Sequence, residues 1–200
     1  MKRYLWSVLM VIALAAASSA QAGEKEAKTY VLGVSNKVLE IISNKKIDQG
    51  TKQTRLIKLF EQTVDTKWIG RFVLGKYYRT ATPAQKKKYD DIYHEFLIRS
   101  YVPRFKEYKG QKFELAETQS HGKGEYLVKT NILSANAAPI RVDYRVREDA
   151  GTFHVIDIIS EGVSLINTQR SEFGSVVSRE GMDYLLDKLK QRLETLKAND

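Results

Sequence analysis

The sequence contains no cysteine and only three proline and three histidine residues. Without cysteine, disulfides and thiolate metal sites are excluded, so the fold must be stabilised by an apolar core. No P-loop, HExxH or GxGxxG motif occurs, and the histidines, His94, His121 and His154, are far apart in the chain. From these absences we predict a protein that is not an enzyme, with no catalytic residue, no metal site and no cofactor.

Only the first residues of the chain form a long apolar run. Lys2 and Arg3 precede an apolar stretch from Leu5 to Ala17, and Ala20-Gln21-Ala22 has the small-x-small pattern of a cleavage site. The stretch is too short to cross a bilayer comfortably, which indicates a signal peptide. We predict a cleaved segment at residues 1–22 and one exported domain at residues 23–200. Loss of two basic residues and no acidic one lowers the formal charge from +9 to +7.

The spacing of apolar residues changes from helical to alternating near the middle of the chain. Helical spacing predicts helices over residues 28–44 and 56–64 and from Pro83 to a break at Pro103. Alternation predicts strands beginning near Phe113 and over residues 126–132, 140–147 and 153–159, with turns at 121–124 and 148–151. Helical spacing returns after Gly162. The expected fold is α+β, a curved antiparallel four-stranded sheet packed by N-terminal and C-terminal helices.

The stretch from Thr66 to Gln85 supplies unusually many large apolar side chains. Asp65 is suited to cap a short helix there and Gly75 to end it. The next helix begins with a Thr-x-x-Gln capping box at residues 82–85. The apolar face of the short helix consists of Trp68, Ile69, Phe72 and Val73. These side chains are either core or one wall of an apolar site.

Two strings resemble a known family. WIGRFVLGKYYRTATPAQ, residues 68–85, followed by Tyr89, and IDIISEGVSLINTQRSEF, residues 156–173, resemble the MlaC (toluene-tolerance) family of periplasmic phospholipid carriers of Gram-negative bacteria. The resemblance extends from about Tyr30 to the last helix. It implies an NTF2-like fold around an apolar cavity, with phospholipid as the ligand. It also implies transfer of lipid between an outer-membrane lipoprotein–porin complex and an inner-membrane ABC transporter, which maintains outer-membrane lipid asymmetry.

With this resemblance, we expect the helix and sheet faces to enclose a pocket for acyl chains. Export argues against nucleic acid as a partner, and we expect a monomer that docks transiently on membrane complexes. The basic residues Lys86 to Lys88, Arg141, Arg145 and Arg147 are candidates for docking acidic partner surfaces. The predicted pocket residues are Trp68, Ile69, Phe72, Val73, Tyr101, Phe105, Tyr126, Val128, Thr130, Ile132, Val142, Tyr144, Val146, Val155, Asp157, Ile159, Val163 and Ile166.

Asp157 leaves alternatives open. Alternation places it on the same sheet face as Phe153, Val155 and Ile159, where a carboxylate should be paired or have a raised pKa. It is either a structural acceptor for a tyrosine hydroxyl or for backbone N–H groups near Gly162, or the general base of a periplasmic isomerase or hydrolase of a hydrophobic substrate. A third possibility is an interaction module whose interior is filled.

Overall fold

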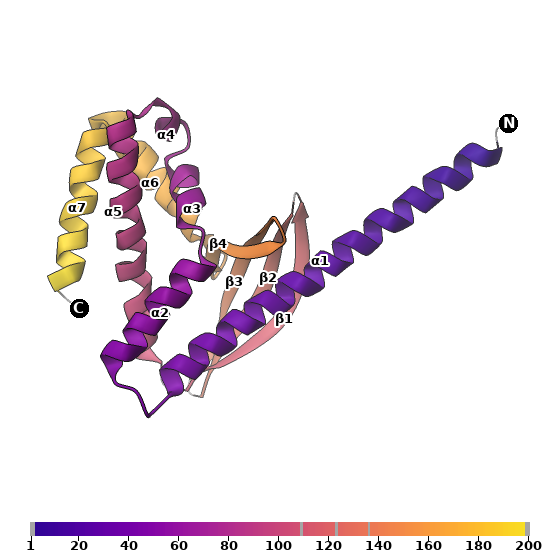
Figure 1. Ribbon diagram of the computed structural model, residues 1–200, viewed down its shortest axis with the longest axis horizontal. Helices are drawn as coiled ribbons and strands as arrows, with labels where there is room; N and C mark the ends of the chain where they lie inside the picture. The colour runs from indigo at the N-terminus through magenta and orange to yellow at the C-terminus, as the bar shows by residue number, and fades with distance from the viewer. Residues whose placement is uncertain (1–2, 109, 123, 136, 199–200) are drawn as a thin grey trace.

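The strands form one antiparallel sheet in the order β1-β2-β3-β4-β5 (Figure 1). The computed structural model describes residues 3–108, 110–122, 124–135 and 137–198. Helix α1 contacts β1 and β2, whereas α2, α3 and α6 contact β4. The elements are α1 (Arg3–Ser43), α2 (Gln49–Thr63), α3 (Thr66–Leu74), α4 (Lys76–Thr80), α5 (Pro83–Tyr101), η1 (Val102–Glu107), β1 (Lys112–Gly122), β2 (Glu125–Ser134), β3 (Ala137–Asp149), β4 (Thr152–Ser160), β5 (Val163–Ser164), α6 (Leu165–Glu180) and α7 (Met182–Ala198).

The four predicted strands are confirmed, and the sheet has a fifth strand that was not predicted. β5 is only two residues long and pairs with the end of β4, Ile159 with Ser164 and Ser160 with Val163. Two residues are too few for alternation to reveal a strand. The predicted turn between β3 and β4 is also confirmed, with Ala150 and Gly151 at positive φ. In the other predicted turn, Lys123 lies outside the described residues.

The helix boundaries in the middle of the chain follow the predicted capping residues. The Asp65 carboxylate accepts a hydrogen bond from the Trp68 N–H at 2.9 Å, and Gly75 ends α3 with φ of 54°. At the start of α5, residues Thr82 and Gln85 form both hydrogen bonds of the capping box, at 3.0 and 3.2 Å. The chain leaves α5 as the 3-10 helix η1, which contains Pro103. The five-residue α4 was not predicted.

Helix α1 is a single helix of 41 residues. Its C-terminal part corresponds to the predicted helix over residues 28–44, and its N-terminal part, where we predict the signal peptide, extends away from the sheet (Figure 1). Ala27 and Val31 in the middle are buried against the sheet. From residue 23 onward, the described helices contain no apolar stretch that could cross a bilayer.

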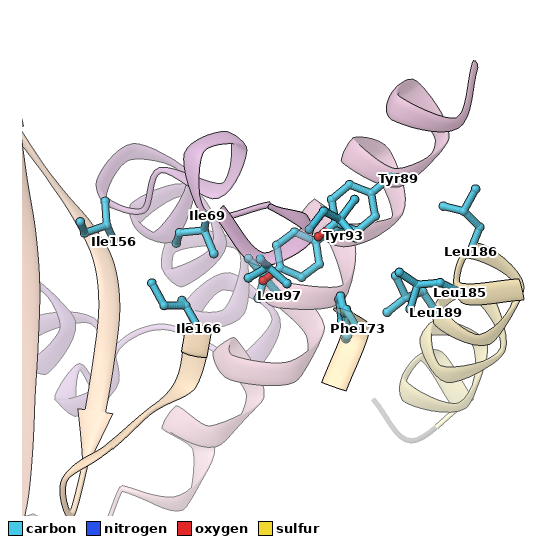
Figure 2. Close-up of a cluster of buried hydrophobic side chains, with 12 residues drawn as sticks. Ile69, Tyr89, Tyr93, Leu97, Ile156, Ile166, Phe173, Leu185, Leu186 and Leu189 are labelled. Atoms are coloured by element: carbon cyan, nitrogen blue, oxygen red, sulfur yellow. The ribbon is translucent and has the colours of Figure 1, made fainter. Parts of the chain in front are cut away.

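The buried apolar residues form three clusters. The helical cluster joins α3, α5, α6 and α7 to β4 and is shown in Figure 2; it contains Ile69, Val73, Leu74, Tyr89, Tyr93, Leu97, Ile156, Ile166, Phe173, Leu185, Leu186 and Leu189. The sheet cluster joins α1 to the sheet; it contains Ala27, Val31, Tyr126, Val128, Val146, Phe153 and Val155. The α2–α5 cluster contains Leu56, Ile98 and Val102.

Candidate functional site

The two predicted walls of the pocket belong to different clusters. Ile69 and Ile166 lie in the helical cluster together with α5 side chains, as Figure 2 shows, and Val73 belongs to the same cluster. Of the predicted sheet wall, Tyr126, Val128, Val146 and Val155 lie in the sheet cluster and pack on α1. The two sets thus pack against different elements, and Val64 packs against both clusters.

Trp68 and Phe72 of α3 stack on each other and on arginine side chains. Their ring centroids are 5.2 Å apart with an interplanar angle of 14°. The Arg147 guanidinium lies 4.8 Å from the Trp68 ring, and that of Arg170 lies 4.7 Å from the Phe72 ring. Arg147 also forms an ion pair with Asp65 at 2.9 Å. Through these cation–π contacts the two partly buried rings of α3 are in contact with β3 and α6.

Asp157 does not share a sheet face with Phe153 and Val155, so that prediction from alternation is wrong. In the β3–β4 ladder Val146 pairs with Val155 but Arg145 pairs with Asp157, which leaves Ile156 as an extra residue in a β-bulge. A bulge shifts the side-chain alternation by one residue. Asp157 is consequently directed toward the start of α6, and the face it shares with Ile159 is the one opposite Val155.

Both carboxylate oxygens of Asp157 accept hydrogen bonds. The Ser164 hydroxyl donates to one oxygen at 2.6 Å, and the Ile166 N–H donates to the other at 3.3 Å. Burial raises the pKa of Asp157, and the hydrogen bonds from Ser164 and Ile166 act in the opposite direction. Of the two roles considered from sequence, this geometry is that of the structural acceptor near Gly162.

Replacing Asp157 by alanine is expected to lower the free energy of unfolding by about 2 kcal/mol, because it removes the acceptor for a buried N–H at a helix start. Asp157→Asn keeps an acceptor oxygen for the Ile166 N–H and is expected to cost less. Urea denaturation of both variants measures the difference. Equal stability of Asp157→Ala and the unsubstituted protein would contradict the capping role.

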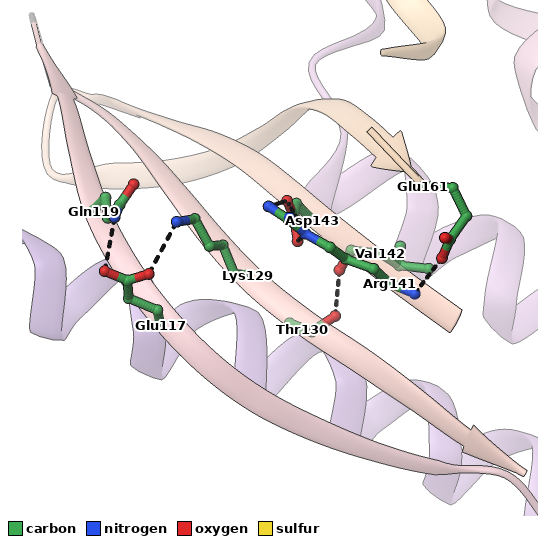
Figure 3. Close-up of polar contacts among 8 residues, drawn as sticks. All are labelled: Glu117, Gln119, Lys129, Thr130, Arg141, Val142, Asp143 and Glu161. Atoms are coloured by element: carbon green, nitrogen blue, oxygen red, sulfur yellow. Dashed lines mark hydrogen bonds and ion pairs between the residues drawn. The ribbon is translucent and has the colours of Figure 1, made fainter. Parts of the chain in front are cut away.

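The other predicted sheet residues have varied surroundings. Thr130 is fully buried, and its hydroxyl donates to the carbonyl of Val142, which is itself buried (Figure 3). Val163 is 58% exposed in the edge strand β5, so its surface is open to solvent. Ile159 pairs with Asp143 and Ser164 at the same edge. Edge positions of this kind contribute little to an enclosed site.

Two sets of partly buried apolar side chains, one packed against the sheet cluster and one against the α2–α5 cluster, are together called the seam here. Its sheet side is formed by Phe113, Tyr144 and Ile158, and its helix side by Ile42, Ile57 and Phe60. These two clusters share no described residue, whereas the helical cluster reaches the sheet cluster through Val64 and the α2–α5 cluster through Phe60.

Tyr144 shows how enclosed the seam is. Its side chain keeps some accessible surface, yet burial raises its pKa to about 12. The Phe113 ring lies 6.1 Å away, and Tyr144 pairs with Ile158 on β4. Ile132, a predicted pocket residue, pairs with Phe113 on the same face. Phe113 and Ile158 were not predicted as site residues; Phe113 follows the alternation, but the bulge conceals the orientation of Ile158.

One end of the helix side contains a small pocket. It lies between the end of α1, α2 and η1, and has a volume of about 80 Å³. Phe105, a predicted site residue, lines it and is 37% exposed, while Tyr101 is half-buried against the helical cluster. The apolar lining is Ile42, Leu56, Val102, Phe105 and Tyr108, and the polar lining is Gln49, Lys52, Gln53 and Lys106. Such a pocket holds only a few water molecules.

The opposite face of the sheet is covered with ion pairs. Lys129 pairs with Glu117 at 2.9 Å and Arg141 with Asp143 at 2.6 Å, as Figure 3 shows. The remaining docking candidates from the sequence are engaged as well: Arg145 with Glu125, Arg147 with Asp65, Lys87 with Asp91, Lys88 with Asp187, and Lys86 over the Tyr78 ring. In the described part of the chain, no group of three or more acidic, histidine or cysteine side chains is arranged to hold a metal ion.

Comparison with known proteins gives a consistent result. The family model described as MlaC protein matches residues 33–191. The intermembrane phospholipid transport system binding protein MlaC of Haemophilus influenzae is 26% identical over 132 residues, 64% of this chain and 62% of that protein. The toluene tolerance protein ttg2D of Pseudomonas putida is 25% identical over 134 residues, 66% of this chain and 61% of that protein. The matched parts thus span less than two thirds of these relatives.

A solved structure supports the fold. The phospholipid-binding protein from Ralstonia solanacearum, determined in complex with a phospholipid, matches with a TM-score of 0.73 and 24% sequence identity. The match covers 85% of this chain and 98% of that chain. The predicted α+β fold is confirmed.

Proposed function

Because the chain belongs to the MlaC family, we propose that it binds a phospholipid by its acyl chains and carries it between membranes. The observation that carries this proposal is the family match over residues 33–191, together with an α+β fold shared with a phospholipid-binding protein. The relatives named above are described as phospholipid transport and toluene tolerance proteins. The role in outer-membrane lipid asymmetry is part of the proposal.

The energetics of acyl chains require an enclosed site. Two acyl chains contain on the order of 30 methylenes, and at about 0.8 kcal/mol each their exposure to water costs on the order of 20 kcal/mol. A shallow surface groove would cover too little of them. The charged head group can stay at the mouth of the site, where it keeps its hydration. We therefore expect the protein to tolerate different head groups.

We propose the seam as the acyl-chain site. Its apolar side chains are already partly accessible, and Tyr144 is surrounded by apolar groups. The pocket of about 80 Å³ at its end is far smaller than the roughly 300–1,000 Å³ of ordinary ligand sites. Taken alone, that volume favours a filled interior, so the proposal requires the α1–α2 pair to move away from the sheet when lipid enters. Because the chain belongs to the MlaC family, we prefer an interior that opens for lipid to one that stays filled.

The remaining parts of the proposal concern location and partners. Residues 1–22 would be removed on export, which leaves a periplasmic domain that acts as a monomer without catalysing a reaction. An outer-membrane lipoprotein–porin complex and an inner-membrane ABC transporter would supply and receive the lipid. The engaged carboxylate of Asp157 gives no support to the rival isomerase or hydrolase.

The test is to identify what co-purifies with the protein. After purification without detergent, organic extraction and mass spectrometry are expected to find phospholipid in near-stoichiometric amount, with mixed head groups. Protein stripped of lipid should take it up again from vesicles. If no lipid co-purifies and none can be loaded, the carrier function is wrong.

A further inference from the structure

The α1–α2 pair carries a groove whose basic residues have no acidic partner. The groove has a volume of about 220 Å³, and is lined by Lys37, Glu40, Ile41, Arg55, Lys58, Leu59 and Gln62. Lys37, Arg55 and Lys58 are exposed, and within the described ranges none of the three forms an ion pair. This distinguishes them from the basic residues of β2, β3 and α5, which are engaged by acidic or aromatic side chains.

The surroundings of the groove are also positively charged. Residues 28–63 contain seven basic and three acidic residues. Of the three acids, Asp48 is engaged in capping α2, accepting hydrogen bonds from Thr51 at 2.6 and 2.9 Å, and Glu61 faces His94 at 3.5 Å. Glu40 is then the one acid of this segment that lies in the groove. The helix pair consequently presents a net positive surface.

We propose that this basic groove docks the protein on an anionic phospholipid bilayer. Lys37, Arg55 and Lys58 would contact lipid phosphates, because basic side chains close to an anionic membrane surface are attracted to it. A protein partner is less suited, since protein interfaces are enriched in aromatic residues and depleted in lysine, and no aromatic side chain lines the groove. Ile41 and Leu59 give the groove an apolar floor too small for an acyl chain.

The position of the groove gives this docking a purpose. Ile41 and Leu59 line the groove, and their neighbours Ile42 and Leu56 line the pocket at the end of the seam. That pocket also carries Lys52 and Lys106. A bilayer held at the groove would therefore lie near the opening of the interior. Docking itself does not depend on the carrier function, because surface binding requires no interior site.

The test measures binding of the purified protein to sedimented vesicles of phosphatidylcholine, with and without phosphatidylglycerol. Binding is expected only with phosphatidylglycerol and should weaken steeply with salt. The triple variant Lys37→Glu, Arg55→Glu, Lys58→Glu is expected to bind about a hundredfold more weakly. Each basic residue strengthens binding to the anionic surface about fivefold. A matched control, Lys188→Glu, Lys190→Glu, Arg192→Glu, makes the same change of charge on exposed positions of α7 and should retain most binding.

Three outcomes would overturn the proposal. The unsubstituted protein could fail to bind either kind of vesicle, or it could bind equally with and without phosphatidylglycerol. The two triple variants could also lose binding equally. The last would show that total charge, and not the groove, is responsible. If the glutamate variant unfolds, the triple glutamine variant at the same positions replaces it. Lipid extraction from the same preparations reports on the carrier function independently.

Discussion

Replacing Ile158 by aspartate is expected to lower phospholipid loading by about a hundredfold or more. Ile158 lies on the sheet side of the seam beside its strand partner Tyr144, and its side chain is partly accessible. A carboxylate there would have to lose water when acyl chains cover it, and a cost of about 3 kcal/mol corresponds to a loss of roughly a hundredfold. Loading from vesicles, followed by extraction and mass spectrometry, measures the change.

The matched control for this variant is Ile140→Asp. Ile140 lies on β3, four residues before Tyr144 and on the same face of the sheet. It is 45% exposed, so a carboxylate there stays in water. Loading of this control is expected to remain close to that of the unsubstituted protein. Urea denaturation of both variants separates loss of binding from loss of folding. Normal loading of a folded Ile158→Asp protein would show that the acyl chains lie elsewhere.

The sequence predicted local features of the fold reliably where the cause is local. The caps at Asp65 and Thr82 depend on a side chain and a backbone N–H three residues away, so the residue pattern contains all the information needed. The same is true of the break at Pro103, whose ring cannot continue a helix. The four long strands were predictable because each alternates over enough residues to be recognised.

The candidate site was less predictable because it depends on contacts between distant segments. Alternation along β4 is correct up to Val155 and then fails, since the extra residue Ile156 is recognised only when β3 is paired beside it. The sequence also did not reveal that Ile69 clusters with α5 side chains and that Tyr126 clusters with α1 side chains. Apolar spacing identifies a buried face but does not identify the element that covers it.

The docking candidates illustrate the same limit for charge. Arg145 and Arg147 are conspicuous in the sequence because they alternate with apolar residues. Their partners are Glu125 and Asp65, which lie 20 and 82 residues away along the chain. Lys37 and Lys58, which have no such partner in the described structure, stand in an ordinary amphipathic pattern. Only the tertiary structure shows which basic side chains remain available to a partner.

Replacing Tyr89 by alanine is expected to lower the free energy of unfolding by about 4 kcal/mol, because it removes a large buried ring. Tyr89 has no exposed surface, stacks on Tyr93 with ring centroids 5.2 Å apart, and donates a hydrogen bond to the Gly70 carbonyl at 3.2 Å. Tyr89→Phe keeps the ring and is expected to cost only about 1 kcal/mol for the lost hydrogen bond. Urea or thermal denaturation of the pair measures both costs.

The same variant distinguishes two locations for the acyl chains. If they lie in the seam, the phospholipid bound per folded Tyr89→Ala molecule should equal that of the unsubstituted protein, because the helical cluster only supports α3 and α5. If they reach Ile69 and Val73 in that cluster, the space left by the ring lies directly beside them and loading should change. Extraction of the folded fraction decides between these locations. If loading is unchanged while stability falls strongly, the helical cluster stabilises the fold without contacting the acyl chains. The seam is then the part of the interior that opens for lipid.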